Sequence, residues 1–275
     1  MTDGLVDVVV GAGSGMGAAV AGRIKGARRL IAADLSQVAA ERTAASLGSG
    51  AESLTCDVTD VAACEALASK VERLGALVVT AGLSPHMADG ERILDVNLTG
   101  SARLLAAFDS AVVEGTAAVL FGSVGGHLLS VSGAVLAALD DPLAPDLSGR
   151  LRAAGVELSD TARAYALSKL GIVRLARRTA AAWWQRGARL MSLSPGIIDT
   201  PMATTELSHQ PIMRSLIDRV GRLGNVDEIA SVVAFLVSDD ASFMTGSNVL
   251  VDGGFMAMTH DWAQPSTVPA QRTSS

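Results

Sequence analysis

The amino-acid sequence predicts a protein of the α/β class, with one doubly wound parallel sheet of seven strands and helices on both faces. Short runs rich in valine, isoleucine and leucine alternate with longer helix-like segments along the chain. Two of these runs, residues 8–10 and 117–120, are apolar without interruption, as is typical of strands covered on both faces. No proline- or glycine-rich linker divides the 275 residues, which favours a single domain.

The expected elements follow one another as strand and helix over most of the chain. Strands are predicted at residues 5–10, 29–33, 53–56, 77–80, 117–121, 189–193 and 248–251. Helices are predicted at residues 15–26, 37–47, 60–73, 98–113, 161–184 and 226–238. The domain is expected to cover residues 1–263. Residues 264–275 are polar, contain two prolines and are expected to form a flexible tail.

Composition and charge exclude several classes of function. The formal net charge of −6 argues against a basic nucleic-acid-binding face, and 3% aromatic residues argue against base-stacking platforms. Cys56 and Cys64 form no CxxC motif, so we expect free thiols in a reducing cytoplasm and no zinc site. The N-terminus lacks the basic and apolar regions of a signal peptide. Residues 116–139 lack charged side chains but contain four glycines, which favours strand, loop and helix over a membrane span.

The first predicted strand runs directly into a glycine-rich loop, residues 11–17, and a helix follows at once. Glycines at such a turn let the backbone approach a pyrophosphate and aim the helix N-terminus at it. Two registers fit a dinucleotide-binding fingerprint, one of Gly13, Gly15 and Ala18, the other of Gly11, Gly15 and Gly17. We prefer the second because it begins immediately after the strand. The expected cofactor contacts in this loop are Gly11, Ser14, Gly15, Met16 and Gly17.

The second and third predicted strands each end at a carboxylate. Asp34 follows Gly17 by 34 − 17 = 17 residues, near the spacing of roughly 20 at which a carboxylate holds ribose hydroxyls. Such a carboxylate repels a 2′-phosphate, and no arginine follows directly, so NAD(H) is favoured over NADP(H). Alternatively, Asp34 is solvated and caps the next helix. Asp57 and Val58 either lie where the adenine binds or belong to a helix cap near Thr59 or Asp60.

Tyr165 and Lys169 form the most specific pattern in the chain. With one tyrosine and three lysines, this spacing arises by chance with odds of 3/274, about one in a hundred. Positions i and i+4 share one face of a helix. A free tyrosine titrates near 10, and an ammonium at about 4 Å lowers a phenol pKa by roughly 2 to 3 units. The pair therefore predicts general acid/base chemistry; the alternative, a surface tyrosine beside an unrelated lysine, fits the apolar neighbours poorly.

The order of the motifs resembles that of the short-chain dehydrogenase/reductase family over most of the chain. The matching motifs are residues 11–17, Thr80-Ala81-Gly82, Val96-Asn97, Gly122-Ser123-Val124, Tyr165-x-x-x-Lys169 and residues 194–200. The resemblance implies a Rossmann fold and a dehydrogenase that uses a nicotinamide dinucleotide. Val10 and Thr80 depart from the family's usual threonine and asparagine, which puts two supporting hydrogen bonds in doubt.

The resemblance also implies roles for four catalytic side chains. Ser123 would hydrogen-bond the substrate oxygen, and Tyr165 would exchange a proton with it. Lys169 would lower the pKa of the tyrosine and hold the nicotinamide ribose, while Asn97 would hold a water that links Lys169 to solvent. Taken singly, Asn97 could be a helix cap and Ser123 a strand-end serine. Further cofactor contacts are implied at Ala81, Gly82, Pro195, Gly196, Ile198 and Thr200.

The spacing between Ser123 and Tyr165 is unusual for this family. The two residues are 165 − 123 = 42 apart, so about thirty residues are inserted, too many for a structureless loop. We expect an insertion at about 127–160 with helices near 128–139 and 148–154. A similar insertion makes the 3α-hydroxysteroid dehydrogenase/carbonyl reductase branch the nearest resemblance. It would obstruct one usual subunit interface, so a homodimer through the last strand and the helix at 226–238 is favoured over a tetramer.

Residues of about 201–223 are expected to form a substrate lid with an apolar face. That face contains Met202, Leu207, Ile212, Met213, Leu216 and Ile217. Because no Lys or Arg cluster stands ready for an anionic group, we expect a hydrophobic secondary alcohol or ketone, steroid-like or alicyclic, as substrate. His86, Met87 and His127 are expected at the opening. The alternative function is a non-catalytic regulatory protein that binds the dinucleotide on the same fold.

Overall fold

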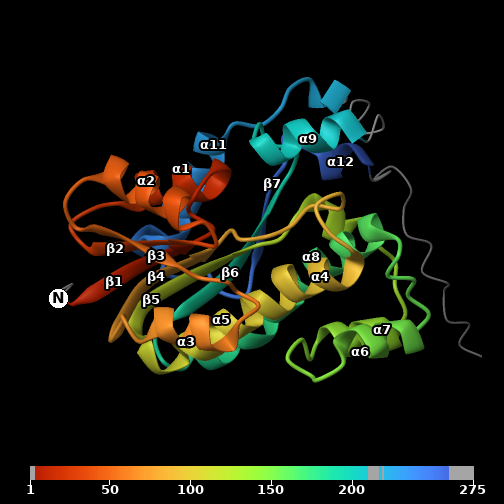
Figure 1. Cartoon of the computed structure of the whole chain (residues 1–275), viewed down its shortest axis with the longest axis horizontal. Coiled ribbons are helices and arrows are strands. Elements are labelled where there is room, and N and C mark those ends of the chain that lie inside the picture. The colour runs from red at the N-terminus through yellow and green to blue at the C-terminus, as the bar shows by residue number, and fades with distance from the viewer. Residues whose placement is uncertain (1–3, 210–216, 219, 260–275) are drawn as a thin grey trace, which may run out of the picture.

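Seven strands form one parallel sheet in the order β3-β2-β1-β4-β5-β6-β7 (Figure 1). The computed structural model describes residues 4–209, 217–218 and 220–259. The strands are β1 Leu5–Val10, β2 Arg29–Asp34, β3 Ala51–Thr55, β4 Arg73–Val79, β5 Val112–Phe121, β6 Arg189–Pro195 and β7 Asn248–Val251. The strand order reverses between β1 and β4, and ligands bind outside the carboxyl ends of the strands at such a switch point.

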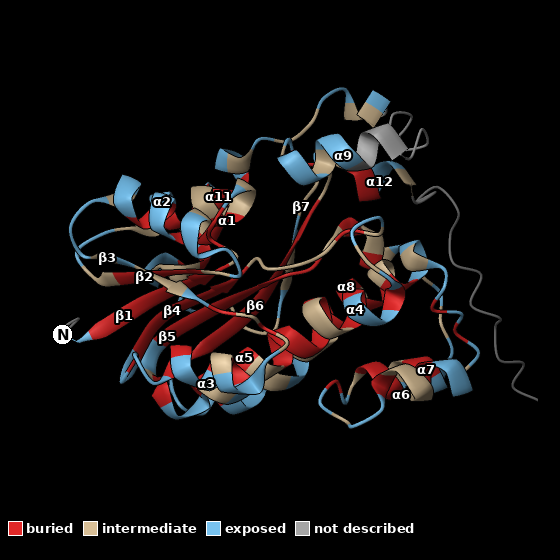
Figure 2. Cartoon of the chain, in the orientation of Figure 1, coloured by how far each residue is buried: buried red, intermediate tan, exposed pale blue. Residues whose placement is uncertain are grey.

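Helices cover both faces of the sheet, as the sequence predicts. On one face lie α1 (Gly15–Ile24), α2 (Gln37–Leu47) and α11 (Val226–Val237), where α1 packs against α11. On the other lie α3 (Val61–Ala68), α4 (Gly90–Leu94), α5 (Gly100–Phe108) and α8 (Thr161–Trp184) (Figure 1). β1 is buried along its length, and β4 and β5 are buried toward their carboxyl ends, because both faces of the sheet are covered (Figure 2).

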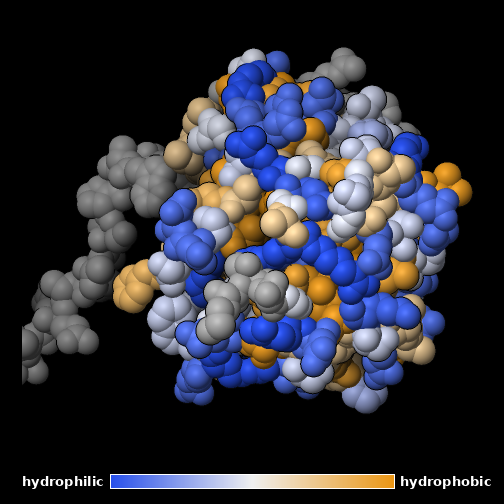
Figure 3. All heavy atoms as spheres, turned by 90° about the vertical axis from the view of Figure 1, so that its left-hand side faces the viewer, coloured by the Kyte–Doolittle hydropathy of each residue, from blue (hydrophilic) through white to orange (hydrophobic). Residues whose placement is uncertain are grey.

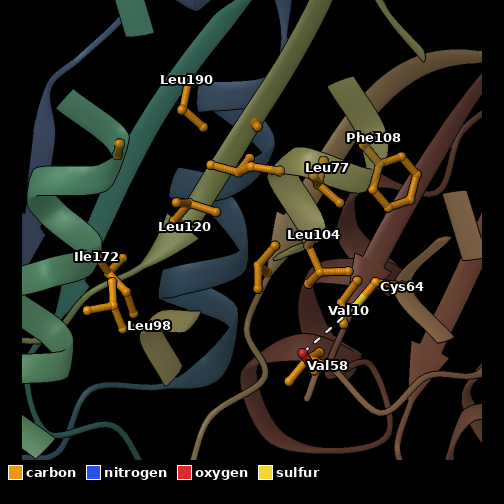
Figure 4. Packing of buried hydrophobic residues seen from close by; sticks show 14 of the residues in the cluster. Val10, Val58, Cys64, Leu77, Leu98, Leu104, Phe108, Leu120, Ile172 and Leu190 are labelled. Atoms are coloured by element: carbon orange, nitrogen blue, oxygen red, sulfur yellow. Dashed lines mark hydrogen bonds between the residues drawn. The ribbon is translucent and has the colours of Figure 1, made fainter. Parts of the chain in front are cut away.

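The core under α5 and α8 is made mostly of aliphatic side chains, joined by Phe108 and Cys64, that pack closely together (Figure 4). Leu98 and Ile172 meet between the two helices, and Gly171 allows this contact because an added Cβ there would lie 2.5 Å from Leu98 Cδ2. This close approach brings the helix that carries Tyr165 onto the carboxyl end of the sheet.

One predicted helix and the strand that follows it, β5, both begin earlier than expected. The helix expected at 98–113 is instead α4, one π-helical turn at Asp95–Thr99, and α5. It begins earlier because the Asp89 side chain accepts from Arg92 N, and because Gly90 lies where a Cβ would overlap the Leu158 carbonyl. β5 begins at Val112, earlier than the predicted residue 117, and the shift in its pairing with β4 after Leu74 accommodates the extra residues.

Boundaries near the third strand also differ. The helix expected at 60–73 ends at Ala68, and β4 already begins at Arg73. Asp60 caps this helix, with its side chain accepting from Ala62 N. The segment between Ser123 and Tyr165 contains α6 (Gly133–Leu139) and α7 (Leu147–Ala153), close to the two helices predicted there.

The remaining elements lie around the carboxyl edge of the sheet. They are the short helical turn η3 (Val124–His127), α9 (Pro201–His209) and α12 (Phe255–Thr259). On the face of the molecule in Figure 3, hydrophilic and hydrophobic residues are intermingled. In the part of the chain that the structure describes, no helix is both long and apolar enough to cross a membrane.

Candidate active site

The glycine loop between β1 and α1 is packed so tightly that several of its glycines have no room for a side chain. Gly11 has a φ of +86°, and an added Cβ would lie 2.5 Å from Ala81 N. A Cβ on Gly17 would overlap the Gly11 carbonyl oxygen, and a Cβ on Gly13 would lie 2.7 Å from Asp34 Oδ2, so the packing does not decide between the two registers. The first turn of α1 lines a cleft here, and the backbone N–H groups of a helix N-terminus favour an anionic group.

Thr80 supplies a hydrogen bond that the sequence left in doubt. Its Oγ1 lies 3.0 Å from Val10 O and 3.1 Å from Gly11 O, so the threonine hydroxyl ties the end of β4 to the glycine loop. Val10 is buried among apolar side chains instead.

Asp34 lies at the end of β2 with its carboxylate beside the glycine loop. Asp34 Oδ2 accepts from Gly13 N at 2.8 Å, and Oδ1 accepts from Ser36 N at 2.9 Å. The alternative role as a helix cap is wrong, because the side chain of Ser36 caps α2. Asp34 is half-buried and lines the cleft, where a carboxylate has lone pairs left for ribose hydroxyls.

Asp57 is held in its own turn at the next strand end. Its Oδ1 accepts from Thr59 N at 2.9 Å and from Thr59 Oγ1 at 2.7 Å, and these bonds lower the pKa of the carboxyl. The Arg92 guanidinium lies 3.8 Å from Asp57 Oδ2. Asp57 does not cap α3, a role taken by Asp60.

One cleft of about 520 Å³ brings together most of the predicted cofactor contacts. Those that line it are Gly11, Ser14, Gly15, Met16, Gly17, Asp34, Asp57, Val58, Ala81, Gly82 and Thr200. Gly196 and Ile198 line a neighbouring cavity of about 240 Å³, and Pro195 is buried at the end of β6. Thr200 reaches the glycine loop, since an added Cβ on Gly15 would lie 3.4 Å from Thr200 Cγ2.

The sequence reasoning missed several residues of this cleft. Leu35, Cys56, Leu83 and Arg92 all line it. Leu35 carried a signal in the sequence, because it is a large apolar residue directly after Asp34; in the structure its side chain is 64% exposed. Nothing in the sequence indicated Arg92, because its position in the cleft depends on how α4 packs.

Lys169 and Tyr165 lie one turn apart on α8. Lys169 Nζ lies 5.7 Å from the centre of the Tyr165 ring and donates to Phe121 O at 2.9 Å. Burial of Lys169 lowers the pKa of its ammonium from 10.5 to about 8. The lysine is thus held between the tyrosine and the end of β5.

Ser123 joins this pair at the end of β5. Its Oγ accepts from Gly125 N at 3.2 Å and so caps η3. Gly125 lies between the two functional side chains, because an added Cβ there would be 3.6 Å from Ser123 Oγ and 3.7 Å from Tyr165 Cε1. Ser123, Tyr165 and Lys169 therefore converge at the carboxyl edge of the sheet.

Asn97 lies in the π-helical turn and binds backbone. Its Oδ1 accepts from Leu83 N at 2.7 Å, and its Nδ2 donates to Leu83 O and to Ser168 Oγ. These bonds hold the segment after β4 next to the lysine, since a Cβ on Gly82 would lie 3.2 Å from Asn97 Oδ1 and 3.4 Å from Lys169 Nζ. Asn97 is not a helix cap, and its role in holding a water stays a prediction.

Residues expected at the opening are distributed differently. Met87 and Met202 line the cleft, whereas His86 is exposed. His127 does not line this cleft and contacts Ser194 and Asn248 instead, so its place at the opening stays a prediction. Ile217 lines the smaller cavity. The side chains of Leu207, Ile212, Met213 and Leu216, named for the lid face, lie outside the described residues.

Metal chemistry has no visible basis in these residues. In residues 4–209, 217–218 and 220–259, no group of three or more His, Cys, Asp or Glu side chains could hold a metal ion. Both cysteines are free and buried.

Known proteins resemble this chain along most of its length. Residues 6–138 match the family model described as short chain dehydrogenase, and residues 152–256 match one described as Enoyl-(Acyl carrier protein) reductase. A D-threitol dehydrogenase of Mycolicibacterium smegmatis is 33% identical, with 92% of this chain and 93% of the relative covered. A 3-alpha-hydroxysteroid dehydrogenase/carbonyl reductase of Comamonas testosteroni is 32% identical, with 70% and 77% covered. A solved short chain dehydrogenase/reductase family protein is 27% identical with a TM-score of 0.70, covering 92% of this chain and 98% of its own.

Proposed function

The chain belongs to the short-chain dehydrogenase/reductase family, and from that premise we propose that it interconverts hydrophobic secondary alcohols and their ketones with NAD(H). The family assigns it to the oxidoreductases that act on CH–OH groups. The observation that carries the proposal is the convergence of Ser123, Tyr165 and Lys169 beside the cleft that the glycine loop lines.

The dinucleotide fits the residues of the cleft. Gly11, Ser14, Gly15, Met16 and Gly17 line the cleft at the N-terminus of α1, and Asp34 presents a carboxylate where ribose hydroxyls would lie. The nicotinamide supplies or accepts the hydride when it is bound. Asp57 and Val58 would contact the adenine, and Gly196, Ile198 and Thr200 would contact the carboxamide end. The Asp34 charge favours NAD(H) over NADP(H) through repulsion of a 2′-phosphate.

The catalytic side chains move one proton. In ketone reduction, Ser123 Oγ hydrogen-bonds the substrate oxygen while the Tyr165 hydroxyl donates its proton to that oxygen. In alcohol oxidation, the tyrosinate takes the hydroxyl proton. The buried Lys169 ammonium lies beside the ring, where its positive charge favours the tyrosinate. Asn97 holds the backbone next to Lys169 and would place a water that connects the lysine to solvent.

Apolar side chains beside the site favour a hydrophobic substrate. Val124, directly after Ser123, packs with Phe255 and Met256 of α12 in a small buried cluster. Met87 and Met202 add flexible apolar surface at the cleft. The resemblance to the hydroxysteroid dehydrogenase/carbonyl reductase of C. testosteroni supports a steroid-like or alicyclic substrate of that branch.

We further propose a cytoplasmic homodimer. β7 is an edge strand of the sheet, and Leu250 on it and Phe235 on α11 are 44% and 43% exposed. Burial of such side chains against a second copy would remove apolar surface from water. The two free thiols support a reducing compartment.

A spectrophotometric screen tests the proposed function. Purified protein is mixed with NAD⁺ or NADP⁺ and a panel of secondary alcohols that includes cyclohexanol, a 3α-hydroxysteroid, 2,3-butanediol and threitol, with absorbance followed at the reduced-nicotinamide band. We expect turnover with a hydrophobic cyclic alcohol and NAD⁺. NADH binding without turnover of any panel member would favour the regulatory alternative, and fastest turnover of threitol would move the substrate to polyols.

A further inference from the structure

The turn that carries Ser123 is held tightly at its centre. Gly126 N donates to Ser123 O at 3.0 Å, and an added Cβ on Gly126 would lie 2.7 Å from Leu170 N. The turn is therefore pressed against the backbone of α8 directly after Lys169. Because its N-terminal end is fixed by β5, the direction of the Ser123 side chain also depends on what holds its C-terminal end.

His127 holds that C-terminal end. Its Nε2 lies 3.1 Å from Ser194 Oγ and 3.2 Å from Asn248 Nδ2. Ser194 is on β6 and Asn248 begins β7, so the imidazole lies against the next two strands. Ser194 donates its one hydroxyl hydrogen to Asn248 Oδ1, so the ring is hydrogen-bonded to Asn248. Gly122 leaves room for the Ser194 hydroxyl, since an added Cβ on that glycine would lie 2.6 Å from Ser194 Oγ.

The hydrogen bonds around Asn248 define what the imidazole does. Asn248 Oδ1 accepts from Ser192 Oγ and from Ser194 Oγ, both at 2.9 Å. The amide nitrogen is then directed at His127, and because an amide N–H only donates, the ring nitrogen Nε2 accepts. The ring is therefore neutral with its proton on Nδ1. Burial lowers the pKa of His127, while the negative charge of Asp252 at the end of β7 acts in the opposite sense.

We propose that His127 is a positioning residue for the reaction, whose hydrogen bond to Asn248 fixes the turn that carries Ser123 and so the reach of Ser123 Oγ toward the substrate oxygen. His127 touches no reacting atom. It acts through the backbone of residues 123–127. The inference rests on the proposed function, since it assigns a purpose to the placement of Ser123.

Kinetics of paired variants test the inference. In His127→Leu the ring and its acceptor nitrogen are lost, and we expect kcat for the fastest alcohol of the panel to fall about ten- to a hundredfold, the effect of a small misplacement of a reacting group. The Kd for NADH, measured by fluorescence, should change less than twofold because the glycine loop is untouched. In His127→Gln an amide oxygen can accept the same bond, and at least half of the lost activity, on a logarithmic scale, should return.

A double-mutant cycle separates this tether from a general loss of packing. If His127 acts through Asn248, the double variant His127→Leu/Asn248→Leu should be no slower than the slower single variant. Unchanged kcat in His127→Leu, strictly additive losses, or no rescue by glutamine would overturn the inference. If a variant does not fold, the wild-type protein still provides a test. The ¹⁵N chemical shifts of the imidazole should show that His127 is neutral and protonated on Nδ1 at pH 7. A charged ring would overturn the inference.

The two proposals fail in different ways. If wild-type protein turns over no alcohol in the panel, the proposed function fails. If the wild type is active and His127→Leu is equally active with unchanged NADH affinity, only the inference about His127 fails.

Discussion

Lys169 Nζ lies 5.7 Å from the centre of the Tyr165 ring and is bound at 2.9 Å to the backbone carbonyl of Phe121. The hydrogen bond to the carbonyl at the end of β5 thus fixes the position of the ammonium relative to the ring. A buried positive charge beside a phenol favours its ionised form more than the same charge would in water. The relationship links the sheet, the lysine and the tyrosine, and it gives rise to the first two predictions.

Replacement of Tyr165 by phenylalanine should abolish proton exchange and leave cofactor binding intact. The variant keeps the ring and loses only the hydroxyl, so we expect kcat to fall by about 10²- to 10⁴-fold, the usual contribution of a general acid/base. Steady-state rates and fluorescence titration with NADH measure the two effects. A variant that keeps more than half of the wild-type rate would contradict the role of the tyrosine.

Replacement of Lys169 by methionine should stabilise the protein at pH 7 while it inactivates it. Burial lowers the pKa of this lysine from 10.5 to about 8, so its charged form disfavours the folded state by about 3 kcal/mol. Loss of the bond to Phe121 O offsets about 1–3 kcal/mol of the gain. We expect a net stabilisation of roughly 1 kcal/mol at pH 7.

The pH dependence fixes the sign of this effect. Between about pH 8 and 10.5, the unfolded chain keeps the proton that the folded chain has released, so the lysine makes the free energy of unfolding rise with pH there. The methionine variant lacks this contribution. Urea unfolding at pH 7 and pH 10 should therefore show the variant's advantage shrinking at pH 10; an advantage that grows with pH would show that the lysine is not destabilised by burial.

The sheet was predictable because its pattern is local. Uninterrupted apolar runs, glycines at the first turn and carboxylates at two strand ends are all visible in sequence, and they place the cleft correctly. The spacing of Tyr165 and Lys169 indicated a shared helix face in the same way. Helix ends were less predictable. α4 begins at Gly90, and the close contact that requires a glycine there is with the carbonyl of Leu158, 68 residues later in the chain.

Contacts between distant segments were not predictable. The side-chain amide of Asn97 hydrogen-bonds the backbone of Leu83, and His127 hydrogen-bonds Asn248, which lies 121 residues later in the sequence. Nothing in the local pattern of either residue gives its partner. In both cases the partner is set by the order of strands and by how α8 packs on them.

Cofactor preference should depend on the charge of Asp34. In Asp34→Asn the side chain keeps its size and one oxygen for Gly13 N or Ser36 N, but it no longer repels a 2′-phosphate. Removal of a charge at contact distance is worth about 1 kcal/mol or more, so the ratio of kcat/KM for NADP⁺ over NAD⁺ should rise at least about fivefold. Wild-type protein that already prefers NADP⁺ would overturn the proposed cofactor.

The proposed dimer predicts that two exposed apolar residues respond differently to a charge. Phe235 on α11 lies in the proposed interface, whereas Leu143 lies in the segment between α6 and α7 that faces α5 and α8. Their side chains are 43% and 50% exposed, so Leu143→Glu is a matched control for the effect of a new surface charge on folding. In a two-fold symmetric dimer each substitution occurs twice in the interface. Two glutamates at position 235 would repel each other, and the apolar surface buried by Phe235 would be lost.

Light scattering should therefore show a dimer for the wild type and for Leu143→Glu, and a monomer for Phe235→Glu. A wild-type tetramer that Leu143→Glu splits into dimers would mean that the segment between α6 and α7 forms an interface instead of obstructing one.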